Sequence, residues 1–356
     1  MKALRIHAGP LAYQHLAQRG LQPSDVGVVP AAAGGPKGLI LGPLDRFLFG
    51  HWLPQSAQPL HLVGASIGAW RMATACLNDP VAALQRLEDA YVRQHYEVPP
   101  GKKRPPASQV SEQFGQNLQS FYAGRVDEVL QHPRYHLHVI AARGRHVLGR
   151  EHPVATPLGY LGAFFSNTVH RKALGAWLER VVFSSPLGGG PAGAPLPAPP
   201  GAYWDGGLTD YHMHLAYHQP QGAINNIAAS AYSESAAGRF DSQSTVGGSE
   251  ASQGAGLVLY PHFQHQVVPG WLDKALRWRH KATPALDSMV VLSPDPQWVK
   301  TLPNAKLPDR QDFTHYGPDT AARSKAWLAA TGAAQQLADE LAQWLQRPDM
   351  GVVHRL

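Results

Sequence analysis

The sequence predicts an α/β fold of three layers, with a mainly parallel central sheet between two layers of helices. In the first part of the chain, short apolar runs alternate with helix-like stretches, which is the pattern of a parallel sheet covered by helices. Hydrophobic residues make up 44% of the 356 residues, enough for a large buried core. Later apolar runs at 256–263 and 288–294 add further strands.

The N-terminal elements are the clearest. We expect strands at 25–32 and 60–64, because each is a short apolar run that a helix-like stretch or a turn follows. A helix is expected at 66–77. The next helix, at 80–96, begins after Asp79, whose carboxylate can cap free N–H groups at a helix start.

The middle of the chain continues this alternation. Helical patterns cover about 109–122 and 125–131, and a clear strand follows at 134–144. Residues 146–149 are expected to pair with that strand as a hairpin. A helix that runs into a short strand is expected over 170–185.

The second half differs in composition along its length. The segment 219–254 is rich in Ser, Gly, Ala and Gln, which predicts a flexible surface insertion. C-terminal strands and a long amphipathic helix at 319–346 complete the region 255–356. We therefore expect one domain over 1–356, with the core that bears the motifs described below at about 1–215.

The pentapeptide Gly64-Ala65-Ser66-Ile67-Gly68 has the form G-x-S-x-G between an apolar strand and a helix. In that setting a sharp turn pushes the serine hydroxyl outward, and the glycines avoid crowding it. The free N–H groups of the helix favour developing negative charge. Ser66 is therefore a candidate nucleophile in an elbow formed by Gly64 and Gly68; a plain turn with a capping serine is the alternative.

A glycine-rich loop lies upstream, after the strand at 25–32. Acyl transfer requires N–H donors for the oxyanion of the tetrahedral intermediate. Gly34 and Gly35 can expose such donors, and Lys37 can add positive charge. A phosphate-binding loop is the alternative, but the spacing G-x-x-x-x-G-K-[ST] is absent, as is the dinucleotide pattern G-x-G-x-x-G.

Asp205-Gly206-Gly207 follows a short apolar segment that is expected to form a strand. An aspartate at a strand end, followed by two glycines, can bring its carboxylate close to another loop. An ordinary Asp-Gly turn is the alternative.

Together and in this order, the three motifs resemble those of the patatin-like phospholipases. The resemblance implies a patatin-like fold in which Ser66 is the nucleophile and Asp205 its partner in a Ser-Asp dyad. It also implies that the amides of Gly34 and Gly35 form the oxyanion hole and that Lys37 is the basic residue of the loop. The motifs span 26–210, a little over half of the chain.

The chain departs from the usual family loop, D-G-G-G-x-[RK]-G, because Ala32 and Ala33 stand at the positions of the aspartate and the first glycine. The two donor glycines are retained. The resemblance implies a lipid acyl hydrolase that cleaves carboxylic esters through an acyl-enzyme. It implies an acyl lipid substrate, no metal and no cofactor, so calcium should be dispensable.

Two other functions stay open. One is an esterase of the α/β-hydrolase type, with a Ser66-His-Asp triad whose histidine is His262, His280 or His315. Ser66 lies early for that fold, and the upstream glycine loop favours the dyad. The other is a catalytically inactive lipid-binding protein of the same fold.

The pairs His136/His138 and His212/His214 have the spacing of metal ligands on a strand, but neither has a convincing third ligand, so ordinary packed or solvated histidines are expected.

Charge and composition limit the partners. The formal charge is +6, with basic residues scattered, which disfavours nucleic acid. The segment 270–281 combines tryptophans with lysines and arginines, so a basic aromatic helix there could make peripheral membrane contact. One cysteine, Cys76, and the lack of an apolar leader predict a cytoplasmic protein that could associate with membranes. Nothing indicates the oligomeric state.

Overall fold

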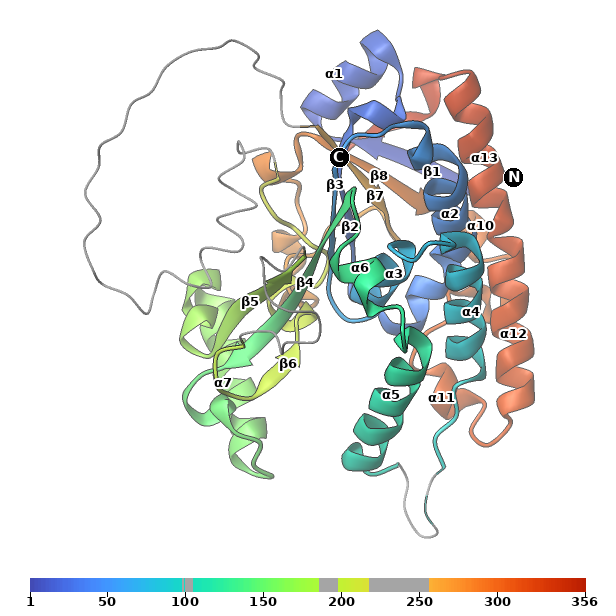
Figure 1. The fold of residues 1–356 in the computed structure, drawn as a ribbon. Coiled ribbons are helices and arrows are strands. Elements are labelled where there is room, and N and C mark those ends of the chain that lie inside the picture. Colours follow the sequence, from blue (N-terminus) through green and yellow to red (C-terminus); the bar gives the residue numbers. More distant parts are fainter. Residues whose placement is uncertain (98, 100–104, 186–197, 218–255) are drawn as a thin grey trace.

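A computed structural model describes residues 1–97, 99, 105–185, 198–217 and 256–356. Within these residues a nine-stranded sheet has the order β5-β4-β3-β2-β7-β8-β1-β9, with β6 beside β4 (Figure 1). The strands are β1 (Leu4–Ala8), β2 (Val26–Ala31), β3 (Leu60–Gly64), β4 (Tyr135–Gly144), β5 (Leu178–Ser184), β6 (Tyr203–Asp205), β7 (Leu257–Pro261), β8 (Met289–Pro294) and β9 (Val353–Arg355).

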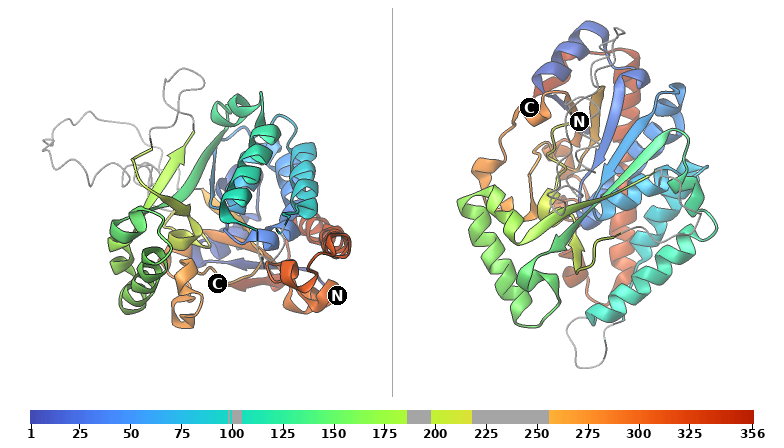
Figure 2. Two further views of the ribbon diagram at one scale, coloured as in Figure 1. Left: turned by 90° about the horizontal axis from the view of Figure 1, so that it is seen from below. Right: turned by 60° about the vertical axis from the view of Figure 1, so that its left-hand side comes forward.

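Helices flank the sheet on both sides. Those of the described residues are α1 (Pro10–Arg19), α2 (Gly42–Phe47), α3 (Ile67–Ala75), α4 (Pro80–Arg93), α5 (Ala107–Tyr122), α6 (Val126–Leu130), α7 (Ala155–Val169), α8 (Gly207–Asp210), α10 (Pro296–Val299), α11 (Asp312–His315), α12 (Thr320–Ala333) and α13 (Gln335–Gln346). The blue, cyan and red helices α2, α3, α4, α12 and α13 gather on one side (Figure 2). Helix α1 packs against β1, β8 and β9.

The sheet is mixed but mostly parallel. The pairs β3–β4, β2–β3, β2–β7, β7–β8 and β1–β9 are parallel, whereas β1–β8, β4–β5 and β4–β6 are antiparallel. The predicted α/β class with a mainly parallel central sheet is therefore confirmed. Parallel strands need both faces covered, which explains why every residue of β7 and of β8 is buried.

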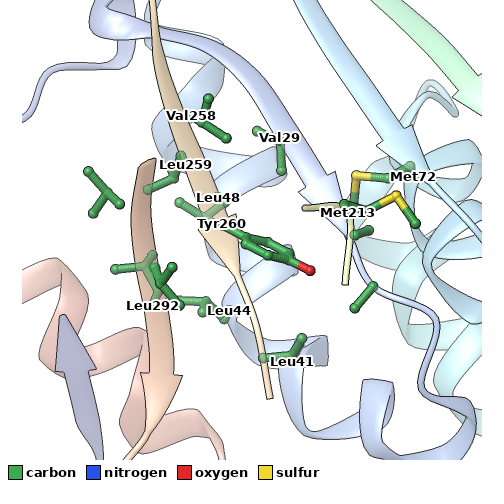
Figure 3. Close-up of a cluster of buried hydrophobic side chains, with 14 of the residues drawn as sticks. Val29, Leu41, Leu44, Leu48, Met72, Met213, Val258, Leu259, Tyr260 and Leu292 are labelled. Carbon is green, nitrogen blue, oxygen red and sulfur yellow. The ribbon is translucent and has the colours of Figure 1, made fainter. Parts of the chain in front are cut away.

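The core lies between the central strands and α2. Leu44 of α2 and Leu48, which directly follows α2, face Leu259 of β7 and Leu292 of β8 (Figure 3). Tyr260 is fully buried among these side chains, and its hydroxyl donates a 2.9 Å hydrogen bond to the carbonyl oxygen of His212. The ring therefore adds apolar burial while its polar atom remains satisfied.

A buried ion pair joins α3, the helix that follows Ser66, to α2. The Arg71 guanidinium donates from Nε and Nη2 to the two carboxylate oxygens of Asp45 at 2.6 and 2.7 Å. Arg71 is 4% exposed and Asp45 is fully buried. Two parallel charge-assisted bonds fix the relative orientation of the two helices.

Most expected elements of the N-terminal part are present, with α4 shorter than expected, and Asp79 accepts the Ala82 N–H at 3.1 Å as the cap of α4. The hairpin expected at 146–149 is wrong, because these residues form a 3-10 helix. Strand β4 already has β5 on one edge and β3 followed by β6 on the other, so no edge remains for a further strand.

The long helix expected at 319–346 is also wrong, since α12 and α13 are separated at Ala334. Ala334 is fully buried, and beyond it the chain turns so that α13 packs on α2 and β1 while α12 packs on α4. The helix expected at the start of 170–185 is a 3-10 helix, Arg171–Ala176, and the strand after it is β5.

The basic aromatic helix expected at 270–281 is wrong as well. The segment forms two short 3-10 helices, Trp271–Asp273 and Arg277–Arg279. They are held by the fully buried Asp273 carboxylate, which accepts from Asn167 Nδ2 and Arg279 Nη1 at 2.8 Å each. The predicted insertion at 219–254 lies outside the described residues.

Candidate active site

The three predicted motifs meet at the carboxyl edge of the sheet. In register, Ala31 of β2 pairs with Gly64 of β3, and Gly64 pairs with Val139 of β4. Because β2 and β3 are parallel, the glycine loop and Ser66 leave the sheet side by side. Strand β6 places Asp205 opposite Ala141 of β4, two residues beyond the level of Gly64.

Ser66 occupies a strained turn between β3 and α3. Its φ of 54° and ψ of −131° lie where side chains are rarely found. A Cβ on Gly64 would lie 2.6 Å from the Ala69 nitrogen, and one on Gly68 would lie 2.1 Å from the Ala31 oxygen. The turn therefore needs glycine at both flanking positions, and it presents the Ser66 side chain at the sheet edge.

The conformation of the glycine loop depends on Gly34 and Gly35. A Cβ on Gly34 would lie 2.4 Å from the Phe263 ring, and Gly35 has a φ of +56°, so other residues would disturb the loop. The N–H groups of Gly34 and Gly35 have no acceptor among the described residues. The Ala33 N–H donates to the backbone carbonyl oxygen of Tyr211 at 2.9 Å, which fastens the loop to the segment after Asp205.

Asp205 is held by its own turn. Its Oδ1 accepts the Gly207 N–H at 2.8 Å, and Oδ2 has no partner among the described residues. A Cβ on Gly206 would lie 2.1 Å from the Ile140 oxygen, so the turn packs tightly against β4. No hydrogen bond joins Ser66 to Asp205 in this part of the chain, but both residues line the same two cavities.

The first cavity has a volume of about 490 Å³ and is mainly apolar. Ser66 lines it together with residues of α3, α5, α6 and β4. Among the described residues its wall consists of Ser66, Ala69, Trp70, Ala73, Phe114, Tyr122, Val126, Val129, Leu130, Leu137, Val139, Ile140, Ala141, Trp204, Asp205 and Gly206. Such a wall suits a hydrocarbon chain.

The second cavity, of about 750 Å³, lies on the other side of the pair and is more polar. It is lined by Ala33, Gly34, Gly35, Lys37, Ser66, Tyr160, Trp204, Asp205, Gly207, Leu208, Tyr211, Trp271, Lys274, Asp309, Arg310 and Gln311. Ser66, Trp204 and Asp205 thus form the boundary between an apolar and a polar compartment.

Three cations face the second cavity. Lys274 Nζ lies 4.3 Å from the Tyr211 ring centroid, and Lys37 Nζ lies 5.5 Å from that of Phe263. Neither lysine, nor Arg310, has a carboxylate within ion-pair distance among the described residues. Partial burial, with the charges of Lys37 and Arg310, lowers the pKa of Lys274 to about 8, although the side chain keeps contact with solvent. An anion bound in this cavity would relieve the repulsion among Lys37, Lys274 and Arg310.

The tyrosines around Asp205 remain neutral phenols at physiological pH. Burial raises the pKa of Tyr160 to about 12, and the Asp205 charge adds to the shift. Burial and Asp205 likewise raise the pKa of Tyr211 to about 12, against an opposing effect of Arg310. These hydroxyls can therefore serve as hydrogen-bond donors in the second cavity, beside the carboxylate.

The histidines proposed for a triad lie elsewhere. None of the described residues that line either cavity is a histidine. His262 is fully buried, and burial lowers its pKa to about 3; His280 Nε2 bonds the Asp273 carbonyl oxygen at 2.9 Å. His315 is exposed beside Tyr316. The structure therefore offers no imidazole base for Ser66 within the part it describes.

The histidine pairs noted in the sequence also form no metal site. His138 bonds His61 at 3.0 Å and the Ser184 hydroxyl at 2.7 Å, which satisfies both of its ring nitrogens. His212 and His214 hydrogen-bond backbone carbonyl groups of 266–267. Across the described residues, no group of three metal-ligating side chains is placed to hold an ion.

Sequence reasoning missed several residues of the site. Lys274 was noticed only as part of a basic aromatic stretch, and Arg310, Tyr160 and Trp204 were not singled out at all. Arg310 and Tyr160 stand in segments with no motif of their own, so only the fold brings them to the cavity.

Comparisons with family models, with curated proteins and with solved structures give no match to this chain. In the residues described, none of the helices has the length and apolar character needed to cross a bilayer. The functional argument therefore depends on the geometry of the site.

Proposed function

We propose that the protein is a lipid acyl hydrolase that cleaves carboxylic esters through a Ser66–Asp205 dyad and an acyl-enzyme. The observation that carries the proposal is the position of both side chains on the wall shared by an apolar and a basic cavity. The free N–H groups of Gly34 and Gly35 lie at the same edge of the sheet. The order of the motifs, which resembles that of patatin-like phospholipases, supports the same conclusion.

In the first half-reaction, Ser66 Oγ attacks the ester carbonyl carbon while its proton moves to Asp205 Oδ2, the oxygen that no described residue occupies. The Gly34 and Gly35 amides donate to the oxyanion. The carbonyl then re-forms, the C–O bond to the alcohol breaks, and the alcohol leaves with the proton from Asp205. The acyl group remains on Ser66.

In the second half-reaction, Asp205 takes a proton from water as the water oxygen attacks the acyl carbon. The same amides hold the second oxyanion. Its collapse breaks the bond to Ser66 Oγ, which regains the proton from Asp205. The products are a free fatty acid and an unchanged enzyme, and no metal takes part in either step.

The two cavities suggest how the substrate is oriented. The apolar cavity along α3 accommodates the acyl chain, since its wall is almost entirely hydrocarbon and aromatic. The basic cavity, with Lys37, Lys274 and Arg310, accommodates the alcohol portion. Cations without a carboxylate partner favour an anionic group there. We therefore propose an acyl lipid with an anionic headgroup, such as a phospholipid or lysophospholipid, as the substrate class.

The test is hydrolysis of a chromogenic acyl ester and of a lysophospholipid, with and without a calcium chelator. Ser66→Ala and Asp205→Asn should each lower kcat by about 10³ or more, since both act in every proton transfer. Ser56→Ala, outside both cavities, serves as the matched control. If His262→Ala abolishes turnover while Asp205→Asn is mild, the triad applies; lipid binding without turnover in the unaltered protein would indicate an inactive binding protein.

A further inference from the structure

Helix α7 presents an apolar stripe to solvent. The stripe consists of Val154, Leu158, Leu161, Phe165 and Val169, which are exposed by 62%, 61%, 54%, 64% and 86%. Their spacing of three or four residues places them on one face of the helix. Residues 155–169 contain no charged side chain. An exposed helix face of this kind is unusual for a monomer in water and indicates a binding surface.

The face of α7 opposite the stripe packs closely against the rest of the protein. A Cβ on Gly159 would lie 2.7 Å from Leu148, and one on Gly162 would lie 2.4 Å from the Trp177 ring, so the inner face of α7 packs in close contact with the protein. Ala163 and Asn167 are fully buried on that face. The apolar side chains therefore point outward from a fixed helix.

Two tryptophans extend this surface. Trp271 and Trp278 are 47% and 60% exposed, and they belong to the segment 271–279, which stands beside α7 (orange beside green in the left view of Figure 2). The contact is anchored by Asp273, to which Asn167 of α7 donates, and Arg279 Nη2 donates to the Thr168 oxygen at 3.1 Å. We call α7 and this segment the α7 face.

The rim of the α7 face is basic. Lys172, Lys274, Arg277 and Lys281 are exposed, and none of them has a carboxylate partner among the described residues. On the same segments, Asp273 is fully buried and paired, and Glu151 is an exposed carboxylate just before α7. The surface therefore combines apolar side chains and tryptophans with a net positive border.

The α7 face borders the second cavity, because Tyr160 of α7 and Trp271 both line it. We propose that this face docks on an anionic lipid surface, with the stripe and the two tryptophans at the level of the acyl chains and the basic rim at the headgroups. A substrate lipid would then enter the cavity between Tyr160 and Trp271 without passing through water. Docking itself does not require turnover at Ser66.

Charge favours a lipid surface over a second copy of the chain. In a two-fold dimer the same patch meets itself, so the basic rims of Lys172, Arg277 and Lys281 would be brought together, with Glu151 as the one exposed carboxylate on the described residues of these segments. An anionic membrane supplies the opposite charge along the entire rim.

Vesicle flotation of the Ser66→Ala protein tests the proposal independently of hydrolysis. The probes are phosphatidylcholine vesicles with and without phosphatidylglycerol. We expect binding to the anionic vesicles that falls with added salt, and at least about tenfold weaker binding for Leu161→Asn/Phe165→Asn. Arg277→Glu/Lys281→Glu should remove the preference for phosphatidylglycerol.

Leu11→Asn, at an equally exposed leucine on α1, is the matched control and should bind as the parent does. Circular dichroism and thermal melting confirm that each variant is folded. The proposal is wrong if the parent does not float with anionic vesicles, or if the α7 variant floats as well as the control. It is also wrong if light scattering finds a dimer that Leu161→Asn/Phe165→Asn dissociates. If vesicle flotation contradicts the proposal while Ser66-dependent hydrolysis is observed, only the docking surface is overturned and the proposed function stands.

Discussion

On the proposed function, Ala73→Phe should shorten the acyl chain that the protein accepts. Ala73 lies on the α3 face that lines the apolar cavity, seven residues beyond Ser66, which is roughly 10 Å along a helix. Val129 and Leu130 of α6 line the same cavity. A phenyl ring at this position would block the far end of the cavity and leave the region next to Ser66 open.

The size of the effect follows from apolar burial. If the ring excludes about three to five methylenes, at roughly 0.8 kcal/mol each, binding of a long chain weakens by roughly 2 to 4 kcal/mol. That corresponds to a loss of about 30- to 1000-fold in kcat/KM for long-chain esters. Acetyl and butyryl esters end before residue 73 and should be hydrolysed at nearly unchanged rates.

The assay is a series of p-nitrophenyl esters of increasing chain length, dispersed below their aggregation limit. The control is Ala329→Phe, the same change at an exposed position of α12 outside the cavity. The reasoning is refuted if Ala73→Phe lowers activity on short and long esters by the same factor, or if long esters are unaffected. The first result would mean a damaged elbow, and the second that the chain binds elsewhere.

Two further predictions concern charge. Affinity for an anionic headgroup should fall as the pH rises through about 8, because Lys274, whose pKa lies near that value, then loses its charge. KM for such an ester, measured across about pH 7 to 9, should therefore rise near pH 8. This rise should be absent in Lys274→Gln and for esters of neutral alcohols. Asp45→Ala should destabilise the fold by about 3–5 kcal/mol in urea titrations, since it leaves the buried Arg71 guanidinium unpaired, whereas Arg125→Ala at a surface pair should cost no more than about 1 kcal/mol.

Elements whose ends are marked by nearby residues could be predicted from the sequence, whereas elements that depend on distant parts of the chain could not. Strand β3 matches its expected bounds because an apolar run there ends at a glycine that the turn requires. The break at Ala334 was not predicted, although Thr331 and Gly332 just before it are poor helix formers; beyond it α13 packs on α2 and β1, whereas α12 packs on α4. Strand β1 was missed because its partners, β8 and β9, lie about 290 and 350 residues away.

The residues of the candidate site also fall into two groups, those that the sequence could indicate and those that it could not. Ser66, Asp205 and the glycine loop could be proposed from the sequence because each needs a particular backbone that glycine reveals. Lys274 and Arg310 could not, since nothing local distinguishes a lysine in a cavity from one on the surface. Lys274 reaches the cavity because its neighbour Asp273 is buried and fastened to α7.

The arrangement is compatible with the proposed dyad, although no hydrogen bond joins Ser66 to Asp205 among the described residues. Asp205 Oδ1 is fixed by the Gly207 N–H, so the carboxylate can turn only about that contact while Oδ2 remains available. An acyl chain in the apolar cavity would displace water from the boundary at Trp204, and electrostatic interactions strengthen as water leaves. Catalytic hydrogen bonds often tighten only when substrate is bound. The dyad is therefore expected to close on the ester, with the strained Ser66 turn held rigid by the sheet beneath it.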